Sequence, residues 1–367
     1  MLVDILACPE CHGNLKTENA AFRCELCSRE YPFINAIYIT DKCRPSKCKR
    51  KCLSACKTGK MQYFSWTKPS KRIRILECNG CGDCLKACPL GAIAAHVTPT
   101  FLRKPSYGNR QDIDVSRSFG MKKDLLRKPE NMFMCGHVAA TYDYVNSKIE
   151  EAKPDFVVDD GCGHNLFAAK YGDNKEIFTL DGYVDRHAYK KVDLLAIGEK
   201  LPLADNSVPV FISNFVLEHV KNPRAYLSEI KRALKREGVL IVSTPTQYWH
   251  FINLFSLYAA FEYLLKIFKD PLGFLKNPWQ HFIVNRAHEK EHCLDDSKKN
   301  VTVLDETRNW TVDKWRTLYE EEGFKVISEK ITGNLLSAHH LGWLGKLWQP
   351  KRIGAHVTFI LRNENHE

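Results

Sequence analysis

Cysteine spacing is the feature that most constrains how this chain can fold. Twelve of the fifteen cysteines lie before residue 89, as two CxxC pairs followed by two runs of four. In a reduced compartment, pairs at such short spacing are typical of metal sites rather than of a disulfide framework. The opening MLVDILACPECHG lacks the basic and apolar regions of a secretory signal, so we expect a cytoplasmic protein with reduced cysteines. The N-terminal quarter is therefore predicted to fold around metal.

The two CxxC pairs are Cys8 with Cys11 and Cys24 with Cys27. Each pair can direct two thiolates at one ion, so together they supply the four ligands of a structural Zn2+ site. The surrounding stretches LACPECHGNL and FRCELCSREYPFINAIYIT resemble the Trm112-like zinc ribbon. Members of that family accompany methyltransferases, either as a partner chain or as an N-terminal fusion. The resemblance implies a zinc ribbon over residues 1–40, closed by a strand at residues 31–39.

Two further cysteine runs follow the ribbon. The first has the spacing C-x4-C-x3-C-x3-C and comprises Cys43, Cys48, Cys52 and Cys56. The second has the spacing C-x2-C-x2-C-x3-C-P and comprises Cys78, Cys81, Cys84 and Cys88. The second run matches the bacterial ferredoxin pattern, in which three cysteines bind one [4Fe-4S] cluster and the fourth binds another. It predicts two clusters, one on Cys56, Cys78, Cys81 and Cys84 and the other on Cys43, Cys48, Cys52 and Cys88. One cluster at the second run, with zinc or an idle set at the first, is the alternative.

The stretches DKCRPSKCKRKC and CNGCGDCLKACPLGAI resemble the N-terminal iron-sulfur region of the ribosome-recycling ABC ATPase. The resemblance implies a ferredoxin-like domain over residues 41–98. One departure is Lys57, which follows Cys56 where that family has a proline. Neither run has the CxxxCxxC spacing of a radical SAM enzyme, which excludes that class.

The formal net charge of +11 belongs to the N-terminal part of the chain. Residues 1–110 hold 19 Lys or Arg against 8 Asp or Glu, whereas the rest of the chain is balanced at 35 against 35. Each zinc or cluster with four thiolates carries about −2, so three such sites offset roughly six of the positive charges. The excess at residues 41–75 suggests RNA or ribosome contact; charge balance for the clusters and a solvated surface is the other interpretation. Tyr63, Phe64 and Trp66 suit base stacking or packing around a cluster equally well.

After a linker at residues 99–130, the chain acquires the pattern of an α/β fold. A strand expected at residues 156–159 ends in Asp159 and is followed by Gly161, Gly163 and a helix. Glycines let the backbone approach a ligand closely, and a helix N-terminus offers free N-H groups. The next apolar strand ends in Asp181, where an acid accepts hydrogen bonds from ribose hydroxyls. Leu166 replaces the third glycine of GxGxxG, which favours a ligand without pyrophosphate.

The stretches VDLLAIGEKLPLADNS and VFISNFVLEH resemble the class I SAM-dependent methyltransferases of the type 11 group, and the resemblance covers most of residues 130–245. It implies a Rossmann-like methyltransferase domain over residues 131–367 that uses S-adenosyl-L-methionine (SAM). By position, the implied SAM-binding residues are Asp159, Gly161 and Gly163 for the methionine part, Asp181 for the ribose, Gly198 and Glu199 for the adenine, and Asn214 and Phe215 beside the sulfonium. Two departures are Ile197 and Pro209, where the family usually has acids.

Local signals place two helices in this half. Asn222 and Pro223 predict the start of a helix over residues 224–236, with Gly238 as its stop. Thr311 is expected to cap a second helix that ends at Gly323.

The catalytic chemistry is expected to be mainly placement, because the methyl group of SAM is already activated. His219 is a weak candidate for a base, and a structural role in the Leu-Glu-His motif is the alternative. No Asn-Pro-Pro-Tyr motif follows the fourth strand, which argues against the amide and exocyclic-amine methylases that use it. The HExxH match at residues 288–292 has polar flanks, which favour a solvated segment over a zinc protease.

Residues 247–283 are rich in Phe, Tyr, Leu and Trp and are expected to form a hydrophobic lid over the acceptor pocket. Contact with a membrane or a lipid-linked acceptor is the alternative. Taken together, these features predict a SAM-dependent methyltransferase whose methyl acceptor is unknown, with zinc and iron-sulfur modules at its N-terminus. The rival interpretation is a non-enzymatic iron-sulfur and zinc binding protein, associated with translation or RNA, that uses a degenerate methyltransferase fold as a scaffold.

Overall fold

The computed structural model describes residues 2–39, 42–43, 47–57, 61–64, 72–75, 81–102, 106–107, 136–163, 165–184, 191–249, 307–332 and 353–364. The chain divides into two compact units, residues 1–113 with 158–207 and residues 114–157 with 208–367. The units cut across the predicted domain boundaries, because residues 158–207 cluster with the N-terminal modules. Cys78, the HExxH match and the predicted lid from residue 250 onward lie outside the described residues.

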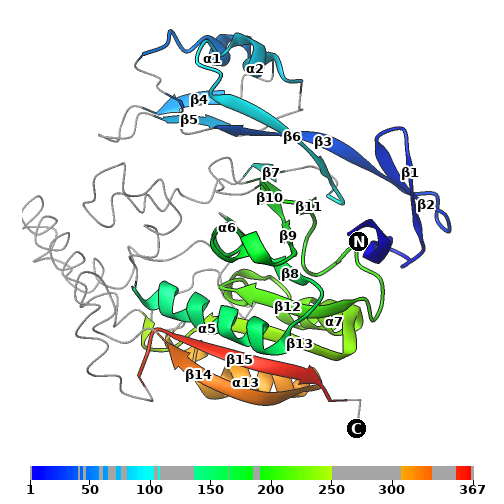
Figure 1. Cartoon of the computed structure of the whole chain (residues 1–367), viewed down its shortest axis with the longest axis vertical. Helices are drawn as coiled ribbons and strands as arrows, with labels where there is room; N and C mark the ends of the chain where they lie inside the picture. The colour runs from blue at the N-terminus through cyan, green and yellow to red at the C-terminus, as the bar shows by residue number, and fades with distance from the viewer. Residues whose placement is uncertain are drawn as a thin grey trace, which may run out of the picture. The chain divides into compact units, whose positions relative to one another are not determined.

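The first unit contains a four-stranded antiparallel sheet in the order β1-β2-β3-β6 (Figure 1). Its strands are β1 (Leu15–Glu18), β2 (Ala21–Cys24), β3 (Glu30–Ile39) and β6 (Ile93–Pro99). The first part of β3 pairs with β2, and its second part, from Phe33 to Ile39, pairs with β6. The strand expected at residues 31–39 is thus present. It belongs both to the cysteine-rich ribbon and to the segment that follows Cys88.

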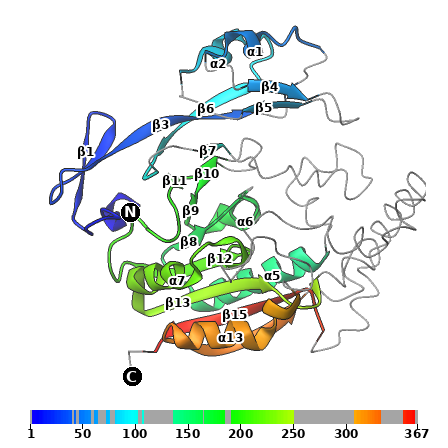
Figure 2. The ribbon, with the colours of Figure 1, turned by 180° about the vertical axis from the view of Figure 1, so that it is seen from behind.

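Two short helices, α1 (Lys51–Ala55) and α2 (Asp83–Ala87), lie side by side in both views (Figures 1 and 2). Between them in the chain, β4 (Met61–Phe64) and β5 (Arg72–Ile75) form an antiparallel hairpin. The core of this part consists of Ala36 to Ile39 of β3, Ile93 of β6 and the two helical cysteines, Cys52 and Cys84.

A second sheet has seven strands in the order β11-β9-β8-β12-β13-β15-β14. Its strands are β8 (Val157–Asp160), β9 (Ile177–Asp181), β11 (Leu194–Leu195), β12 (Val208–Asn214), β13 (Leu234–Pro245), β14 (Phe324–Thr332) and β15 (His356–Asn363). Strand β11 runs parallel to β9, and β12 runs parallel to β13. The last strand, β15, is antiparallel to both β13 and β14. The parallel strand pairs and the helices that connect the strands confirm the predicted Rossmann-like α/β fold.

Among the described residues, this sheet is accompanied by the helices α5 (Gly136–Ala152), α6 (Leu166–Tyr171), α7 (Pro223–Ala233) and α13 (Val312–Glu321). In the second unit, α5 and α13 lie on opposite faces of β15, with α5 in front in Figure 1 and α13 in front in Figure 2. Both predicted caps are present, because Asn222 accepts a 3.1 Å hydrogen bond from Ala225 N and Thr311 accepts a 3.3 Å bond from Lys314 N. No helix among the described residues is long and apolar enough to cross a membrane.

The predicted end of the helix after Pro223 is wrong. The helix ends at Ala233 rather than near residue 236, and Gly238 lies inside β13. Leu234 is already extended and pairs with Val208, so the strand starts earlier than the pattern suggests. Gly238 is needed there for close approach, since a Cβ atom would lie 2.8 Å from Lys235 O.

Residues 93–107 connect the antiparallel sheet to the β9–β11 edge within the first unit. Phe101 N donates a 2.8 Å hydrogen bond to Leu195 O of β11. Further on, β7 (Ser106–Tyr107) runs parallel to β10 (Tyr183–Val184). Val184 and Leu195 also belong to the hydrophobic core that contains β3 and β6. The metal-type modules and the β9–β11 edge therefore share one core.

Candidate metal centres and cofactor site

The two CxxC pairs form knuckles of the same geometry. In the first, His12 N donates a 2.8 Å bond to Cys8 O and Cys8 N donates to Gly13 O; in the second, Ser28 N donates to Cys24 O and Cys24 N to Arg29 O. The residue after each pair has a left-handed backbone, with φ of 57° at His12 and 56° at Ser28. This turn brings the second cysteine of each pair back toward the first.

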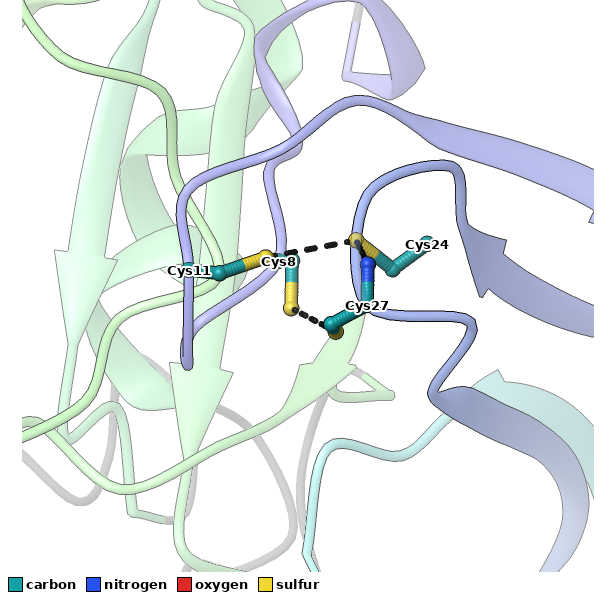
Figure 3. A group of neighbouring side chains, drawn as sticks. All are labelled: Cys8, Cys11, Cys24 and Cys27. Atoms are coloured by element: carbon teal, nitrogen blue, oxygen red, sulfur yellow. Dashed lines mark hydrogen bonds between the residues drawn. The ribbon is translucent and has the colours of Figure 1, made fainter.

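The four sulfur atoms of the knuckles lie within 4.8 Å of one another and point toward a common centre (Figure 3). Cys8 Sγ is 3.7 Å from Cys27 Sγ, and Cys11 Sγ is 3.4 Å from Cys24 Sγ. Burial opposes ionisation of Cys24, but hydrogen bonds from Cys27 N and the Cys11 thiol outweigh it and lower the pKa of Cys24 to about 7. A gathered set of four thiols with an accessible thiolate fits one tetrahedral metal ion.

The ribbon is attached to the segment that follows β11, inside the first unit. Ala7 N donates a 3.1 Å bond to Pro202 O, and Ala204 N donates a 2.8 Å bond to Ile5 O. Leu6 and Leu203 form the antiparallel bridge between these bonds, and both side chains are buried. The ribbon thus adds a short strand to residues 202–204, close in sequence to the predicted adenine-binding residues.

The two short helices of the ferredoxin-like segment repeat one geometry. Each follows a left-handed residue, Arg50 with φ of 52° or Gly82 with φ of 76°, and each has a buried cysteine at its second position. Each also ends at a further cysteine, whose backbone N-H bonds to the leucine carbonyl three residues earlier: Cys56 to Leu53 and Cys88 to Leu85. The two helices, each with its two cysteines, are therefore structural repeats, as expected of a pair of ferredoxin half-sites.

Cys52 lies among the cysteines of one predicted cluster. Burial, and then the charges of Cys88, Cys48 and Cys43, raise the pKa of Cys52 to about 11. Cys88 comes from the second run, so it lies near the first, as the crossed assignment expects. Of the other predicted set, Cys56, Cys81 and Cys84 are described and Cys78 is not. The charged neighbours of Cys52 favour the assignment in which Cys88 joins the cysteines of the first run. The two sets of cluster ligands stay predictions.

The glycine-rich turn after β8 is held by backbone hydrogen bonds to β9. Gly161 N and Cys162 N both bond to Leu180 O, at 2.9 and 3.0 Å. Gly163 N donates a 2.7 Å bond to Asp181 Oδ2. Gly161 and Gly163 have φ of 71° and 52°, a conformation that side-chain-bearing residues rarely adopt. The turn and the acid at the end of β9 are thus one built unit.

Two carboxylates at this turn are buried, Asp159 at 3% and Asp181 at 6% exposure. Burial raises the pKa of Cys162 well above its usual value, and the negative charges of Asp181 and Asp159 add to the effect. The Cys162 side chain packs against the core that also contacts Cys56 and Cys88. The structure therefore places a cysteine that the sequence analysis passed over between the two acids and the ferredoxin-like segment.

The predicted adenine-binding residues Gly198 and Glu199 follow β11 in a turn and are partly buried. Ile197, which stands where the family has an acid, is 46% exposed. Its Cγ2 lies 3.8 Å from where a Cβ atom of Gly182 would be. An apolar, half-exposed side chain there can contact a flat base but offers it no hydrogen bond.

In the second unit, Asn214 is the last residue of β12 and is 8% exposed. Both its amide nitrogen and its amide oxygen lack a hydrogen-bond partner among the described residues. Phe215, which follows, has φ of 60°, so β12 ends in a strained corner. His219 ends the short 3-10 helix η4 (Leu217–His219), and its Nε2 lies 3.9 Å from Glu218 Oε1.

Beside this corner lies a histidine that the sequence analysis did not single out. The His356 ring is 4.4 Å from the Phe215 ring, and His356 Nδ1 is 3.2 Å from Thr141 Oγ1. A histidine in an apolar C-terminal strand carries no motif, so only the sheet order brings it to this place.

Residues 158–242 match the family described as "Methyltransferase domain". Translation initiation factor rli1 of Schizosaccharomyces pombe is 42% identical over 73 residues, and RLI1 of Saccharomyces cerevisiae is 44% identical over 72. Each match covers 18% of this chain, and the chain spans only 12% of the length of these relatives.

Solved structures of methyltransferases resemble the chain at low sequence identity. A complex of the Haloferax volcanii Trm112 methyltransferase activator with a methyltransferase aligns at 17% identity and a TM-score of 0.35, over 60% of this chain and 95% of that one. An S-adenosylmethionine dependent methyltransferase from Mesorhizobium loti aligns at 14% identity and a TM-score of 0.35, over 59% and 96%. It is the family match, together with the strand order, that gives residues 158–242 a methyltransferase domain with a Rossmann-like fold.

Proposed function

We propose that this protein is a SAM-dependent methyltransferase whose N-terminal part holds one zinc ion and two [4Fe-4S] clusters. The observation that carries the proposal is the bond from Gly163 N to Asp181 Oδ2, which joins the glycine turn to the acid at the end of β9. Around it, the left-handed glycines leave room for a ligand against the backbone, and Asp159 supplies a second buried carboxylate. The match of residues 158–242 to a methyltransferase domain supports the same conclusion.

Bound SAM would supply a methyl group already activated on its sulfonium. Asp181 Oδ2 accepts from Gly163 N and Asp181 Oδ1 accepts from Tyr183 N. Because a carboxylate oxygen can accept more than one hydrogen bond, Asp181 is proposed to accept from the ribose hydroxyls as well. Gly198 and Glu199 are proposed near the adenine, with Ile197 packing on the base. Asn214 is proposed beside the sulfonium, where a ligand would satisfy the two amide groups that lack a partner among the described residues. The role of these residues is to hold and orient.

Calorimetry of the full chain with SAM tests the proposal. We expect SAM to bind the protein, with a loss of affinity of about tenfold or more in D181A, which removes charge-assisted bonds worth about 1.5–3 kcal/mol. Asp173 is an exposed carboxylate on the short helix η3 (Gly172–Asn174) of the same unit, so D173N is the matched control and should bind like the wild type. No heat at millimolar SAM would refute the proposal.

The zinc and iron content of the purified protein tests the metal assignments. Anaerobically purified protein should contain one zinc and about eight irons per chain, and fewer than four irons would refute two clusters. The gathered sulfurs of the two knuckles support the zinc site, and the repeated helices with Cys52 beside Cys88 support the crossed clusters. Methyl transfer itself needs no electrons, so structural, RNA-contacting and redox-sensing roles for the clusters all stay open. Reduced thiolates fit a reducing compartment, and we propose the cytoplasm as the location of the protein.

A second candidate is a non-enzymatic metal-binding protein linked to translation or RNA. It is favoured by the similarity to proteins named translation initiation factors and by the exposed basic residues before and within α1: Lys42, Lys47, Lys49, Arg50 and Lys51. RNA or ribosome contact through residues 41–75 would show as binding that weakens steeply with salt. RNA contact is compatible with the methyltransferase proposal, but a protein that binds RNA and does not bind SAM would favour the second candidate.

The methyl acceptor is not specified by these residues. The predicted lid at 247–283 would cover it, and a membrane or lipid-linked acceptor is one class it would suit. Mass spectrometry of RNA and metabolites from cells lacking the gene should reveal one species that has lost about 14 Da, the mass of a transferred methyl group replacing hydrogen.

A further inference from the structure

The Asp181 carboxylate is held from two sides within the first unit. Gly163 N donates to its Oδ2 atom at 2.7 Å, and Tyr183 N donates to its Oδ1 atom at 3.2 Å. The first donor belongs to the glycine turn, but the second belongs to β10, the strand that pairs with β7. The orientation of this carboxylate therefore depends on the position of β10 as well as on the turn.

The residues that fix the neighbours of Asp181 come from the stretch that follows β6. Thr100 forms a parallel bridge with Leu195 of β11, and Phe101 N donates a 2.8 Å bond to Leu195 O. Ala196, the next residue, donates a 3.0 Å bond to Asp181 O. Strand β7 then pairs with β10. Both β10 and β11 are thus hydrogen-bonded to the chain that leaves the ferredoxin-like segment.

The same region shares a hydrophobic core with the two cysteine-bearing helices. This core contains Cys52 of α1, Cys84 of α2, Val184 of β10 and Leu195 of β11, and Cys162 of the glycine turn packs against it. Val184 is 1% exposed and Leu195 is fully buried. Strand β6 contacts both α2 and β11. Because a close-packed core has little free volume, a shift of the helices is transmitted to β10 and β11.

The two helices are too short to be stable alone. They have five residues each, whereas an isolated helix needs about 12–15 residues to form in water. Their buried cysteines, Cys52 and Cys84, and the cysteines at their ends, Cys56 and Cys88, are thiol donors in a repeated geometry, which fits the proposed clusters. Metal on these thiolates would fix both helices, because metal-binding free energy becomes folding free energy in small metal-binding modules.

We propose that the ferredoxin-like segment controls SAM binding: metal binding by its cysteines and SAM binding at Asp181 stabilise each other. This inference rests on the proposed function. With both helices fixed, the shared core holds β10 and β11, and the Asp181 carboxylate is oriented before SAM arrives. When the cysteines lose their metal, the core loosens and SAM affinity falls. Coupling between two sites is reciprocal, so SAM in turn favours retention of the metal. The clusters then switch the methyltransferase on rather than carry electrons for it.

Calorimetry of the anaerobically purified full chain compares the wild type with C84S. The variant should lose about four irons per chain and keep its zinc, because Cys84 belongs to one predicted cluster and not to the knuckles. We expect its SAM affinity to fall about tenfold or more. Loss of iron from C84S with unchanged SAM affinity would overturn the proposal.

V184A tests the link with the clusters in place. The substitution opens a cavity in the shared core next to Tyr183, so we expect the iron content of the wild type and a SAM affinity that is about fivefold lower. V210A is the matched control, because Val210 is a similarly buried valine, 2% exposed, on β12 of the second unit. It should bind SAM like the wild type. Equal SAM affinities in V184A and V210A would overturn the proposal.

Hydrogen exchange separates this inference from the proposed function, because it needs no SAM. In C84S, amide exchange should be faster than in the wild type at residues 181–184 and 194–196, and unchanged in β12 and β13. Unchanged exchange at residues 181–184, or equally faster exchange in β12 and β13, would overturn a specific coupling. A wild-type chain that shows the coupled exchange but binds no SAM would refute the methyltransferase and leave the coupling of the cysteines to Asp181 standing.

Discussion

Gly163 donates its backbone N-H to the Asp181 carboxylate at 2.7 Å, so the glycine turn and the acid of the next strand form one rigid unit. Eighteen residues separate them in the chain. The bond fixes the carboxylate against the turn before any ligand arrives, and preorganisation of this kind lowers the entropy lost on binding.

Replacing Gly163 by alanine should therefore weaken SAM binding more than it weakens the fold. At φ of 52° an alanine is strained, which costs about 1–2 kcal/mol, and relief of that strain would move the N-H away from Asp181. We expect SAM affinity to fall about tenfold, as measured by calorimetry. Gly323 has φ of 75° beyond α13, so G323A is a matched control that should lower stability and leave SAM affinity unchanged. Equal losses of affinity in both variants would contradict this account.

The attachment of the ribbon should depend on apolar packing rather than on its ion pairs. Leu203 is fully buried opposite Leu6, and L203A should lower the free energy of unfolding by about 2–5 kcal/mol in urea titrations. Glu10 bonds to Lys200 at 3.1 Å and to Arg29 at 2.8 Å, but both cations are about half exposed. E10A should therefore cost less than about 1 kcal/mol. A larger loss in E10A than in L203A would show that charge, not packing, holds the ribbon.

Removing one of the proposed zinc ligands should loosen two segments at once. C24S should not retain the proposed zinc, and hydrogen exchange should then increase in β1 and β2 and also at residues 202–204, because Ile5 and Ala7 bond to that segment. C162S is the control, since Cys162 is not part of the knuckles, and it should retain zinc. Faster exchange confined to β1 and β2 would mean that the docked strand is independent of the metal.

Replacing Cys88 and replacing Cys56 should each remove a different iron-sulfur cluster, because each cysteine is predicted to bind the cluster of the other run. If Cys88 completes the set around Cys52, C88S should lose about four of eight irons and leave the cluster on the second run assembled. C56S should give the reverse result, and electron paramagnetic resonance of the reduced variants should tell the two remaining clusters apart. Loss of all iron in C88S alone would favour a single cluster.

The features that could be predicted from the sequence are those built from neighbouring residues. The knuckles, the Asn222 and Thr311 caps and the glycine turn each depend on a few consecutive positions, and short spacing specifies their geometry. The end of α7 was missed because pairing of Leu234 with Val208 overrides the local stop signal at Gly238. Such pairing is set by the sheet.

His356 could not be found in the same way. Its contact with Thr141 joins residues 215 positions apart, and its contact with Phe215 exists only because β15 inserts between β13 and β14. The sequence also does not show that β3 belongs to two modules, because the first part of the strand pairs with β2 and the second part pairs with β6, which is distant in the chain.

Replacing Asn214 should affect the stability of the fold and the affinity for SAM in opposite directions. Its amide is buried without a hydrogen-bond partner among the described residues, and such a group costs the fold about 1–3 kcal/mol. Replacement by an apolar residue of similar size removes that cost, so N214L should be as stable as wild type or more stable in urea titrations. If the amide serves the ligand, N214L should also lose SAM affinity by about tenfold or more.

The matched control for Asn214 is Asn222, whose side chain caps α7 by accepting from Ala225 N. N222A should lower the free energy of unfolding by about 1 kcal/mol and leave SAM affinity unchanged. The two asparagines should thus give opposite results in the two measurements. If N214L is destabilised like N222A and binds SAM normally, Asn214 is a structural residue, and other residues must contact the sulfonium of SAM.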